Sequence, residues 1–525
     1  MKSRLQLLLL VGLLLLLVSP TAAQKEPYFP TTEWRTSTPE AQGMSSAEIT
    51  ALFETFSQPH FNLDSLLVAR HGVIVAEAYA PPFAQDMKHQ VASVTKSVTG
   101  TLIGVLLQQG LLETLDAPLL SFFTDRTAAN LDAGKEAITL RNLLTMTSGM
   151  DCDQVAQAGA PTIAMVETED WVQFALDLAV PEEPGTAFHY CNPAVHLLSA
   201  VIAEVAGMPA ADYASEHLFA PLGITDYAWT AAPEGNSVGF AELYLNTRDQ
   251  AKIGLLYLNG GQWDGQQIIP TEFAQAAIST QAQPGWPNTG YGYLWWTFTP
   301  SSGAIAVGFA GQYILIDPAK DLVVVLTGTF NEMSRFPVQY LPLAFTVMGL
   351  TTSDEALPDD DTAYGQLEAV LDRIDNPTPV EPAPLPPLAE QLNTMTVYLG
   401  GPLKIDIPST NPVQNDPGVM IAGMRWNFSN PEQAVVTLNL ADGGAWVLPI
   451  NLNGVYAVSE SPIGLLVGAR GEWRTDSEFT FFVKYAGGEV LVRVDCLFYP
   501  GGIQVRTSES SRGSAAFMPG VVVPS

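Results

Sequence analysis

The stretch SVTKSVTGTLIGVLLQQG, Ser93 to Gly110, sets a serine and a lysine at the start of an apolar, helix-forming run. The run predicts a helix from Ser93 through Leu107 that stops near Gly110. Side chains three residues apart share one face of a helix, so Ser93 and Lys96 are expected to be neighbours. A serine becomes a nucleophile when another group takes its proton, and a lysine can do this when burial lowers its pKa. On this motif alone, a helix-capping serine with a lysine in solvent remains an alternative.

Two further segments carry groups that could join this pair. Tyr190-Cys191-Asn192 is expected in a loop before a helix. Its tyrosine can hold or accept a proton, and its asparagine amide can bind both a lysine and a substrate carbonyl. Gly308-Phe309-Ala310-Gly311-Gln312 enters a strand, where glycines let a substrate approach the backbone. The N–H of Gln312 could form an oxyanion hole with the N–H of Ser93. Taken singly, each segment could also be an ordinary surface loop or strand turn.

In this order, the three segments resemble the Ser-x-x-Lys, Tyr-x-Asn and Lys/His-x-Gly set of the penicillin-recognising enzymes. They are most similar to the class C β-lactamase-like serine hydrolases, which include esterases, D-amino-acid peptidases and amide hydrolases. The resemblance covers roughly residues 30–350. The runs LRNLLTMTSGM (140–150), LNTRDQAKIGLLYLNGGQWDGQQIIP (245–270) and QYILIDPAKDLVVVL (312–326) also fit it.

The resemblance implies a role for each matching residue. Ser93 would be the acylated nucleophile and Lys96 its proton acceptor. Tyr190 would be the base or proton shuttle, and Asn192 would bind substrate and the lysine. The backbone of Ser93 and Gln312 would form the oxyanion hole. The resemblance implies no cofactor, and six scattered histidines without HExxH or CxxC spacing make a protein-built metal site an unfavoured interpretation.

The third motif departs from the family at Phe309, which stands where the family has Lys or His. An aromatic ring cannot make the charge-assisted hydrogen bond that holds a substrate carboxylate. We therefore expect Phe309, Gly311 and Gln312 to bind a neutral small-molecule ester or amide. We expect β-lactams and cell-wall peptides to be hydrolysed less efficiently than such neutral substrates.

The chain has three cysteines, Cys152, Cys191 and Cys496. In the family, the runs that contain the first two lie near each other, which implies a Cys152–Cys191 disulfide. Three is an odd number, so at least one cysteine stays free or pairs with another chain.

The rest of the chain predicts an α+β fold followed by a separate all-β domain. Strand-like runs at the two ends flank a mainly helical stretch over about 112–235: 64–70 and 73–77, then 291–296, 304–307, 312–316 and 322–326. The simplest closure is one antiparallel sheet flanked by helices, with an inserted all-α lobe, as in the β-lactamase/transpeptidase-like fold. Beyond a proline-rich segment, 377–387, short alternating runs predict a sandwich or partly open barrel.

The predicted domains are a signal peptide (1–23), a β-lactamase-like domain (24–375), a Pro-rich linker (376–389) and an all-β domain (390–525). The leader has basic Lys2 and Arg4, a 12-residue apolar run over 7–18, and small residues at 21–23 for cleavage. It predicts a secreted or extracytoplasmic protein without stable membrane insertion after cleavage. An uncleaved anchor is the alternative, and the region has no cysteine to carry a lipid.

The net charge of −31 disfavours nucleic acid and anionic membrane surfaces as partners.

A hydrolase that forms an acyl-enzyme is the leading hypothesis. A β-lactamase or peptidoglycan D-peptidase is the alternative within catalysis. A non-catalytic protein that binds a ligand through its C-terminal β domain is the alternative from another class.

Overall fold

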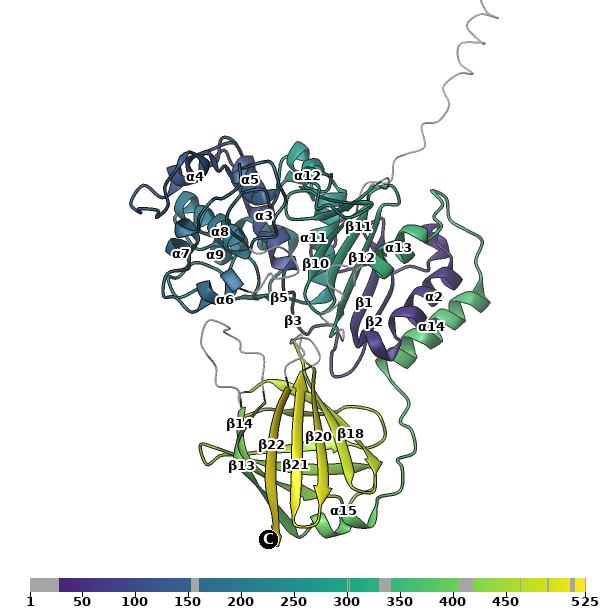
Figure 1. The fold of residues 1–525 in the computed structure, drawn as a ribbon. Coiled ribbons are helices and arrows are strands. Elements are labelled where there is room, and N and C mark those ends of the chain that lie inside the picture. Colours follow the sequence, from purple (N-terminus) through teal and green to yellow (C-terminus); the bar gives the residue numbers. More distant parts are fainter. Residues whose placement is uncertain are drawn as a thin grey trace, which may run out of the picture.

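The computed structural model describes residues 28–152, 160–299, 301, 303–329, 341–405, 419–462, 464–488, 491–509 and 515–524. The predicted signal peptide lies outside these residues. The chain folds into an N-terminal domain of mixed helices and strands, described from residue 28 to 375, and a β-barrel beside it (Figure 1).

A seven-stranded antiparallel sheet forms the centre of the N-terminal domain, in the order β2-β1-β12-β11-β10-β9-β8. Leu66 of β1 lies opposite Leu326 of β12, so the early hairpin joins the late strands as predicted. The central strands are buried along their whole length because helices cover both faces of the sheet. The strand bounds are β1 (Leu63–Arg70), β2 (Val73–Tyr79), β8 (Thr289–Tyr291), β9 (Trp296–Phe298), β10 (Ala304–Gly308), β11 (Gln312–Asp317) and β12 (Leu322–Gly328).

The predicted single strand over 291–296 was wrong, because β8 ends at Tyr291 and β9 begins at Trp296. The residues between them turn the chain. Leu294 has a left-handed φ of 62°, and its N–H donates to the carbonyl of Leu144 at 3.0 Å. Gly292 lies so close to the carbonyl of Ala277 that a Cβ atom would collide with it. Tertiary contacts therefore override the alternating aromatic pattern of this run.

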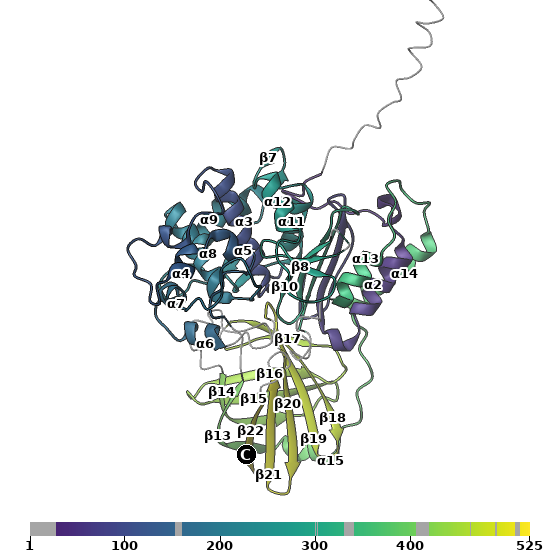
Figure 2. The same ribbon diagram turned by 45° about the horizontal axis from the view of Figure 1, so that its top comes forward.

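One face of the sheet is covered by α2 (Ser46–Phe56), α13 (Leu341–Gly349) and α14 (Asp361–Asp375), as Figure 2 shows. The other face carries α3 (Val94–Gln108) and α11 (Thr247–Leu258), which pack on the central strands. The helical lobe follows α3 in the chain. Its helices are α4 (Ala133–Ala137), α5 (Leu140–Leu144), α6 (Ala160–Val166), α7 (Trp171–Asp177), α8 (Asn192–Ala206), α9 (Ala210–Ala214) and α10 (Ala220–Leu222), and α12 (Thr271–Ala277) lies after α11.

Within the described ranges, no single helix is long and apolar enough to cross a membrane. In the described part of the chain, one pair of helical segments, α8 with residues 210–222, passes by length and composition, but it is bent by 71°.

The C-terminal domain is a barrel of ten strands, in the order β16-β15-β14-β13-β22-β21-β20-β19-β18-β17. A further pairing of β16 with β18, Asn451 to Arg470, closes it. Alternate residues point inward and form one apolar core. The bounds are β13 (Met395–Ile405), β14 (Val419–Asn427), β15 (Gln433–Leu440), β16 (Ala445–Asn451), β17 (Ala457–Glu460), β18 (Leu466–Thr475), β19 (Glu478–Tyr485), β20 (Leu491–Tyr499), β21 (Gly502–Glu509) and β22 (Ala515–Pro524).

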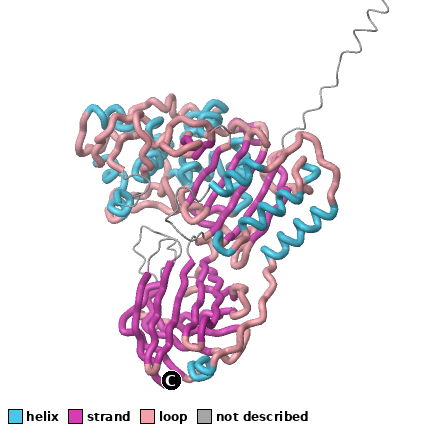
Figure 3. The backbone as a smooth tube through the Cα atoms, turned by 45° about the vertical axis from the view of Figure 1, so that its right-hand side comes forward, coloured by secondary structure: helices cyan, strands magenta, loops and turns pink. Residues whose placement is uncertain are grey.

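The segment between the domains runs without helix or strand from residue 376 to 386, and α15 (Pro387–Leu392) follows it. It descends from the end of α14 along the side of the barrel to its far end (Figure 3). The last residues of the predicted linker are therefore helical, and Pro387 occupies the first helical position, which a proline tolerates.

A small sheet of the N-terminal domain faces the barrel (Figure 1). It comprises β3 (His89–Gln90), β5 (Leu243–Leu245) and β4 (Ala228–Trp229), with β5 in the middle. A separate two-stranded sheet, β6 (Gln262–Trp263) with β7 (Gln266–Gln267), lies after α11. Because β3 ends three residues before Ser93, the candidate nucleophile follows directly from this domain interface.

Candidate active site

Ser93 occupies the N-cap position of α3, and its side chain makes no capping hydrogen bond there. The residue before it, Ala92, has a left-handed φ of 46°, a conformation that costs an L-residue about 1–2 kcal/mol. The chain tolerates this because Val91 is fixed by a hydrogen bond from its N–H to the carbonyl of Leu243, 2.9 Å long. The sharp turn ends β3 and starts α3 with the serine at the helix N-terminus, where the helix dipole favours negative charge.

Lys96 lies one turn into α3, and its Nζ is 2.7 Å from Ser93 Oγ and 2.9 Å from the carbonyl oxygen of Phe240. The residue is 1% exposed. None of the ion pairs among the described residues includes it. Burial without a compensating carboxylate holds the pKa of Lys96 well below its usual range. The amine is therefore suited to accept the serine proton.

Tyr190 completes the cluster. Its ring lies 4.9 Å from Lys96 Nζ, and its hydroxyl interacts with the Ser93 side chain. Burial raises the pKa of Tyr190, and the bond to Ser93 opposes this only in part. The phenol thus holds its proton. Of the two roles that the resemblance allows, this favours the proton shuttle over an anionic base.

The ring of Tyr190 is held by aromatic side chains. It stacks on Trp296 with ring centres 6.2 Å apart, and Trp296 stacks in turn on Trp286 at 5.3 Å. Trp296 also meets Phe188. These contacts fix the plane of the tyrosine ring, so its hydroxyl keeps its direction toward Ser93.

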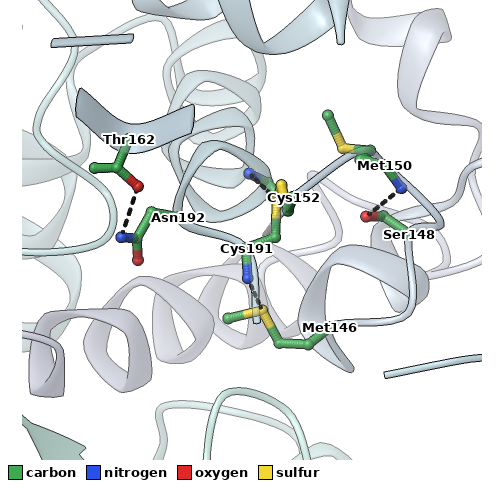
Figure 4. The surroundings of a disulfide bond; sticks show 8 residues. Met146, Ser148, Met150, Cys152, Thr162, Cys191 and Asn192 are labelled. Atoms are coloured by element: carbon green, nitrogen blue, oxygen red, sulfur yellow. Dashed lines mark hydrogen bonds between the residues drawn. A yellow bond between two sulfur atoms is a disulfide. The ribbon is translucent and has the colours of Figure 1, made fainter. Parts of the chain in front are cut away.

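The structure contains the Cys152–Cys191 disulfide, with the two Cα atoms 5.4 Å apart (Figure 4). Cys191 caps α8, and its N–H donates to Met146 Sδ at 3.3 Å. Since Cys191 lies between Tyr190 and Asn192, the bridge ties the second motif to the chain that follows Met150. Cys496 is free and buried in the barrel.

Asn192 makes no hydrogen bond to Lys96, which corrects the expectation that it binds the lysine. Its Nδ2 donates to Thr162 Oγ1 on α6 at 3.0 Å, as Figure 4 shows. The lysine partners are instead Ser93 and the Phe240 carbonyl. Asn192 Oδ1 is buried and has no hydrogen-bond partner among the described residues. This leaves a free acceptor beside Tyr190.

The third motif forms the turn between β10 and β11, where Gly308 pairs with Gln312. A Cβ atom on Gly308 would lie 2.5 Å from the carbonyl oxygen of Val91, so only glycine lets the hairpin end lie against the segment that carries Ser93. Phe309 is partly exposed on this turn. Gln312 points its amide at the carbonyl of Gly328, 2.7 Å away, so any role of Gln312 at the site belongs to its backbone.

The sequence analysis did not identify three parts of the candidate active site. The Phe240 carbonyl offers no side-chain signal, and Thr162 lies on a short helix without a motif. Trp296 belongs to the run 291–296, which the sequence marks only as strand-like; it is 2% exposed and stacks on Tyr190.

Comparison with known proteins supplies the family. The beta-lactamase family model matches residues 49–340, which include Ser93, Lys96 and Tyr190. The chain belongs to this family. Members of the beta-lactamase family are hydrolases, and the N-terminal domain has their fold.

The chain is also similar to several named proteins. The 6-aminohexanoate-dimer hydrolase of Paenarthrobacter ureafaciens is 24% identical over 289 residues, which are 51% of this chain and 73% of that protein. Esterase EstB of Burkholderia gladioli is 28% identical over 193 residues, 33% of this chain and 49% of the esterase. The solved structure of EstCE1, a hydrolase with promiscuous acyltransferase activity, matches with a TM-score of 0.46 and 17% identity, over 63% of this chain and 99% of its own.

Proposed function

We propose that this protein is a serine hydrolase that cleaves an uncharged ester or amide through an acyl-enzyme on Ser93. The observation that carries this proposal is the buried Lys96 amine, 2.7 Å from Ser93 Oγ and without a carboxylate partner among the described residues. A lysine placed only for stability would pair its charge, because burying an unpaired charge is costly.

The cluster supports a two-step acyl transfer. In the first step the neutral Lys96 Nζ takes the Ser93 hydroxyl proton as Oγ attacks the substrate carbonyl carbon. The bond to the leaving group breaks, and the Tyr190 hydroxyl gives that group a proton, which Lys96 then replaces. In the second step water attacks the acyl carbon, the same two side chains take its proton, and Ser93 Oγ leaves with a proton restored. Atoms and charge balance over the cycle without a cofactor.

The neutral substrate follows from the third motif. Phe309 stands on the turn next to the Ser93 segment and offers no cation to a carboxylate. The relatives named as a 6-aminohexanoate-dimer hydrolase and as an esterase support the same reaction class. We also propose that the protein acts outside the cytoplasm, supported by its leader sequence and by a disulfide that suits an oxidising compartment.

The test is covalent labelling of the full chain with a fluorophosphonate, followed by turnover of p-nitrophenyl esters, simple amides and a chromogenic cephalosporin. Wild-type protein should label at Ser93 and cleave the esters or amides faster than the cephalosporin. Ser93→Ala should not label, whereas the matched control Ser121→Ala, at an exposed position of a short 3-10 helix, should behave as wild type. Labelling that persists in Ser93→Ala would refute the nucleophile. Faster cephalosporin turnover would instead establish the β-lactamase alternative.

A further inference from the structure

The barrel inserts a buried lysine into the N-terminal domain. Lys484, near the end of β19, is 3% exposed and forms an ion pair with Asp64 on β1, whose side chain is fully buried. Its Nζ also lies 3.4 Å from the carbonyl oxygen of Asn62 and 5.4 Å from the centre of the Phe83 ring. A charge on one domain is thus neutralised inside the other.

The same carboxylate holds the segment that leads to the nucleophile. Asp64 Oδ2 lies 2.9 Å from Nε2 of His89 and accepts a hydrogen bond from Thr329 Oγ1 at 3.2 Å. His89 is 2% exposed, stacks on Phe83 with ring centres 5.0 Å apart, and precedes Ser93 by four residues. Lys484 and His89 therefore share one buried carboxylate.

A second contact reaches the next residue of the segment. The N–H of Gln90 donates to the carbonyl of Gly487 on the barrel at 2.8 Å. Gly487 has a φ of 88°, and a Cβ atom there would lie 2.9 Å from the carbonyl of Lys88. The turn after β19 can approach β3 this closely only with glycine at this position.

These anchors act on a strained piece of backbone. Ala92 has left-handed φ, so the helix start at Ser93 stays in place only while the chain before Ala92 is fixed. The N-terminal domain supplies part of the fixation, through Val91 N–H to Leu243 and through Gln90 Nε2 to Glu242 Oε1 at 2.6 Å. The barrel adds two contacts of its own, through Lys484 and Gly487.

We propose that the barrel positions the nucleophile. Lys484, acting through Asp64 and His89, and Gly487, acting on Gln90, hold residues 89–93 where Ser93 Oγ meets Lys96 Nζ. Lys484 is thus a positioning residue and not a catalytic one. The catalytic consequence rests on the proposed function of Ser93, whereas the positional claim does not.

The first test uses Lys484→Met in the full-length protein. Amide hydrogen exchange should accelerate in peptides that cover residues 89–96, with exchange in α2 and α14 unchanged. Fluorophosphonate labelling should slow on the order of 10- to 100-fold, and kcat for an ester should fall with little change in KM. The matched control is Lys88→Met, which removes a partly exposed lysine of the same region that pairs with Asp226. It should leave exchange and labelling as in wild type.

A double variant separates positioning from mere loss of stability. Asp64→Asn with Lys484→Met removes both charges, so the uncompensated buried carboxylate is gone. Stability should recover while labelling stays slow, since nothing from the barrel then holds His89. Full recovery of both would show that Lys484 acts only by neutralising Asp64, which would overturn the proposal.

A second variant tests the Gly487 contact and leaves the ion pair between Lys484 and Asp64 unchanged. Gly487→Ala should push the barrel turn off Lys88 and slow labelling, whereas Gly443→Ala, with a similar φ of 91° but nothing within 4 Å, should not. If Lys484→Met does not fold, the comparison of Gly487→Ala with Gly443→Ala tests the proposal instead. Unchanged exchange at 89–96 in folded Lys484→Met or Gly487→Ala overturns the inference and leaves the proposed function intact. Faster exchange in a protein whose wild type never labels supports the inference and refutes the proposed function.

Discussion

Replacing Lys96 by methionine should change how the free energy of unfolding depends on pH. Lys96 is 1% exposed, and burial lowers its pKa below the 10.5 of a free lysine. Between its folded pKa and 10.5, the unfolded chain binds one proton more than the folded chain. The free energy of unfolding therefore rises with pH across this window. Below the folded pKa both states are protonated, and the full cost of the buried charge is present.

The size of the effect follows from the single proton. The slope contributed by Lys96 reaches about 1.4 kcal/mol per pH unit within the window and is zero outside it. The side chain is buried, so solvent screening does not reduce this value. Methionine has similar length and cannot titrate. The lost donor to the Phe240 carbonyl costs about 1–3 kcal/mol, but this offset is the same at every pH.

The assay is equilibrium denaturation of wild type and Lys96→Met from about pH 5 to about pH 10. The two proteins differ at one side chain, so other titrations cancel in the difference between their unfolding free energies. The free energy of unfolding of wild type should increase relative to that of Lys96→Met as pH rises. Lys88→Met, which removes a partly exposed lysine, is the matched control. A difference that stays flat across the range, or that falls with pH, would refute the assignment of Lys96 as a neutral base.

Three further changes test the other parts of the site. Tyr190→Phe should lower kcat for an ester by about 10²–10⁴-fold with KM retained, because the proton shuttle is lost while the stacked ring stays; equal activity in steady-state assays would remove Tyr190 from the mechanism. Cys152→Ser should lower the free energy of unfolding by about 4 kcal/mol, from a disulfide that spans 39 residues, as measured by denaturant titration against wild type with and without reductant; no loss would show that the bridge does not constrain the unfolded chain. Phe309→His should raise kcat/KM for an ester that carries a carboxylate by roughly 10-fold relative to its methyl ester, and an unchanged ratio would separate Phe309 from substrate recognition.

The sequence predicted the sheet because its strands have strong local signals. Leu322–Gly328 is almost continuously apolar and pairs with an equally apolar β1. The run over 291–296 has a strand-like alternation too, yet its turn is decided by the distant Ala277 and Leu144, which no local pattern reveals. The choice between sandwich and barrel was also out of reach. Both produce alternating strands, and one pairing between β16 and β18 closes the barrel.

The same distinction holds at the site. The neighbourhood of Ser93 and Lys96 follows from helix periodicity, and Tyr190 followed from the order of motifs. The hydrogen-bond partner of Lys96 could not be predicted from the sequence, because the position of a backbone carbonyl such as that of Phe240 depends only on where a loop passes. The orientation of Asn192 depends on the position of α6, which brings Thr162 within reach. Sequence thus predicted which side chains the site uses, and packing decides what each one faces.

Two independent features bear on the charge of the substrate. The turn at Phe309 provides no cation beside the nucleophile, so a carboxylate there would lose its water without gaining a charged partner. The protein as a whole carries a net charge of −31, which lowers the local concentration of anions around it. The first effect is local and insensitive to salt, whereas the second is screened by salt. For an anionic ester, raising the ionic strength should therefore recover the association rate but leave the penalty at Phe309, and kcat/KM should stay below that of the neutral ester at high salt.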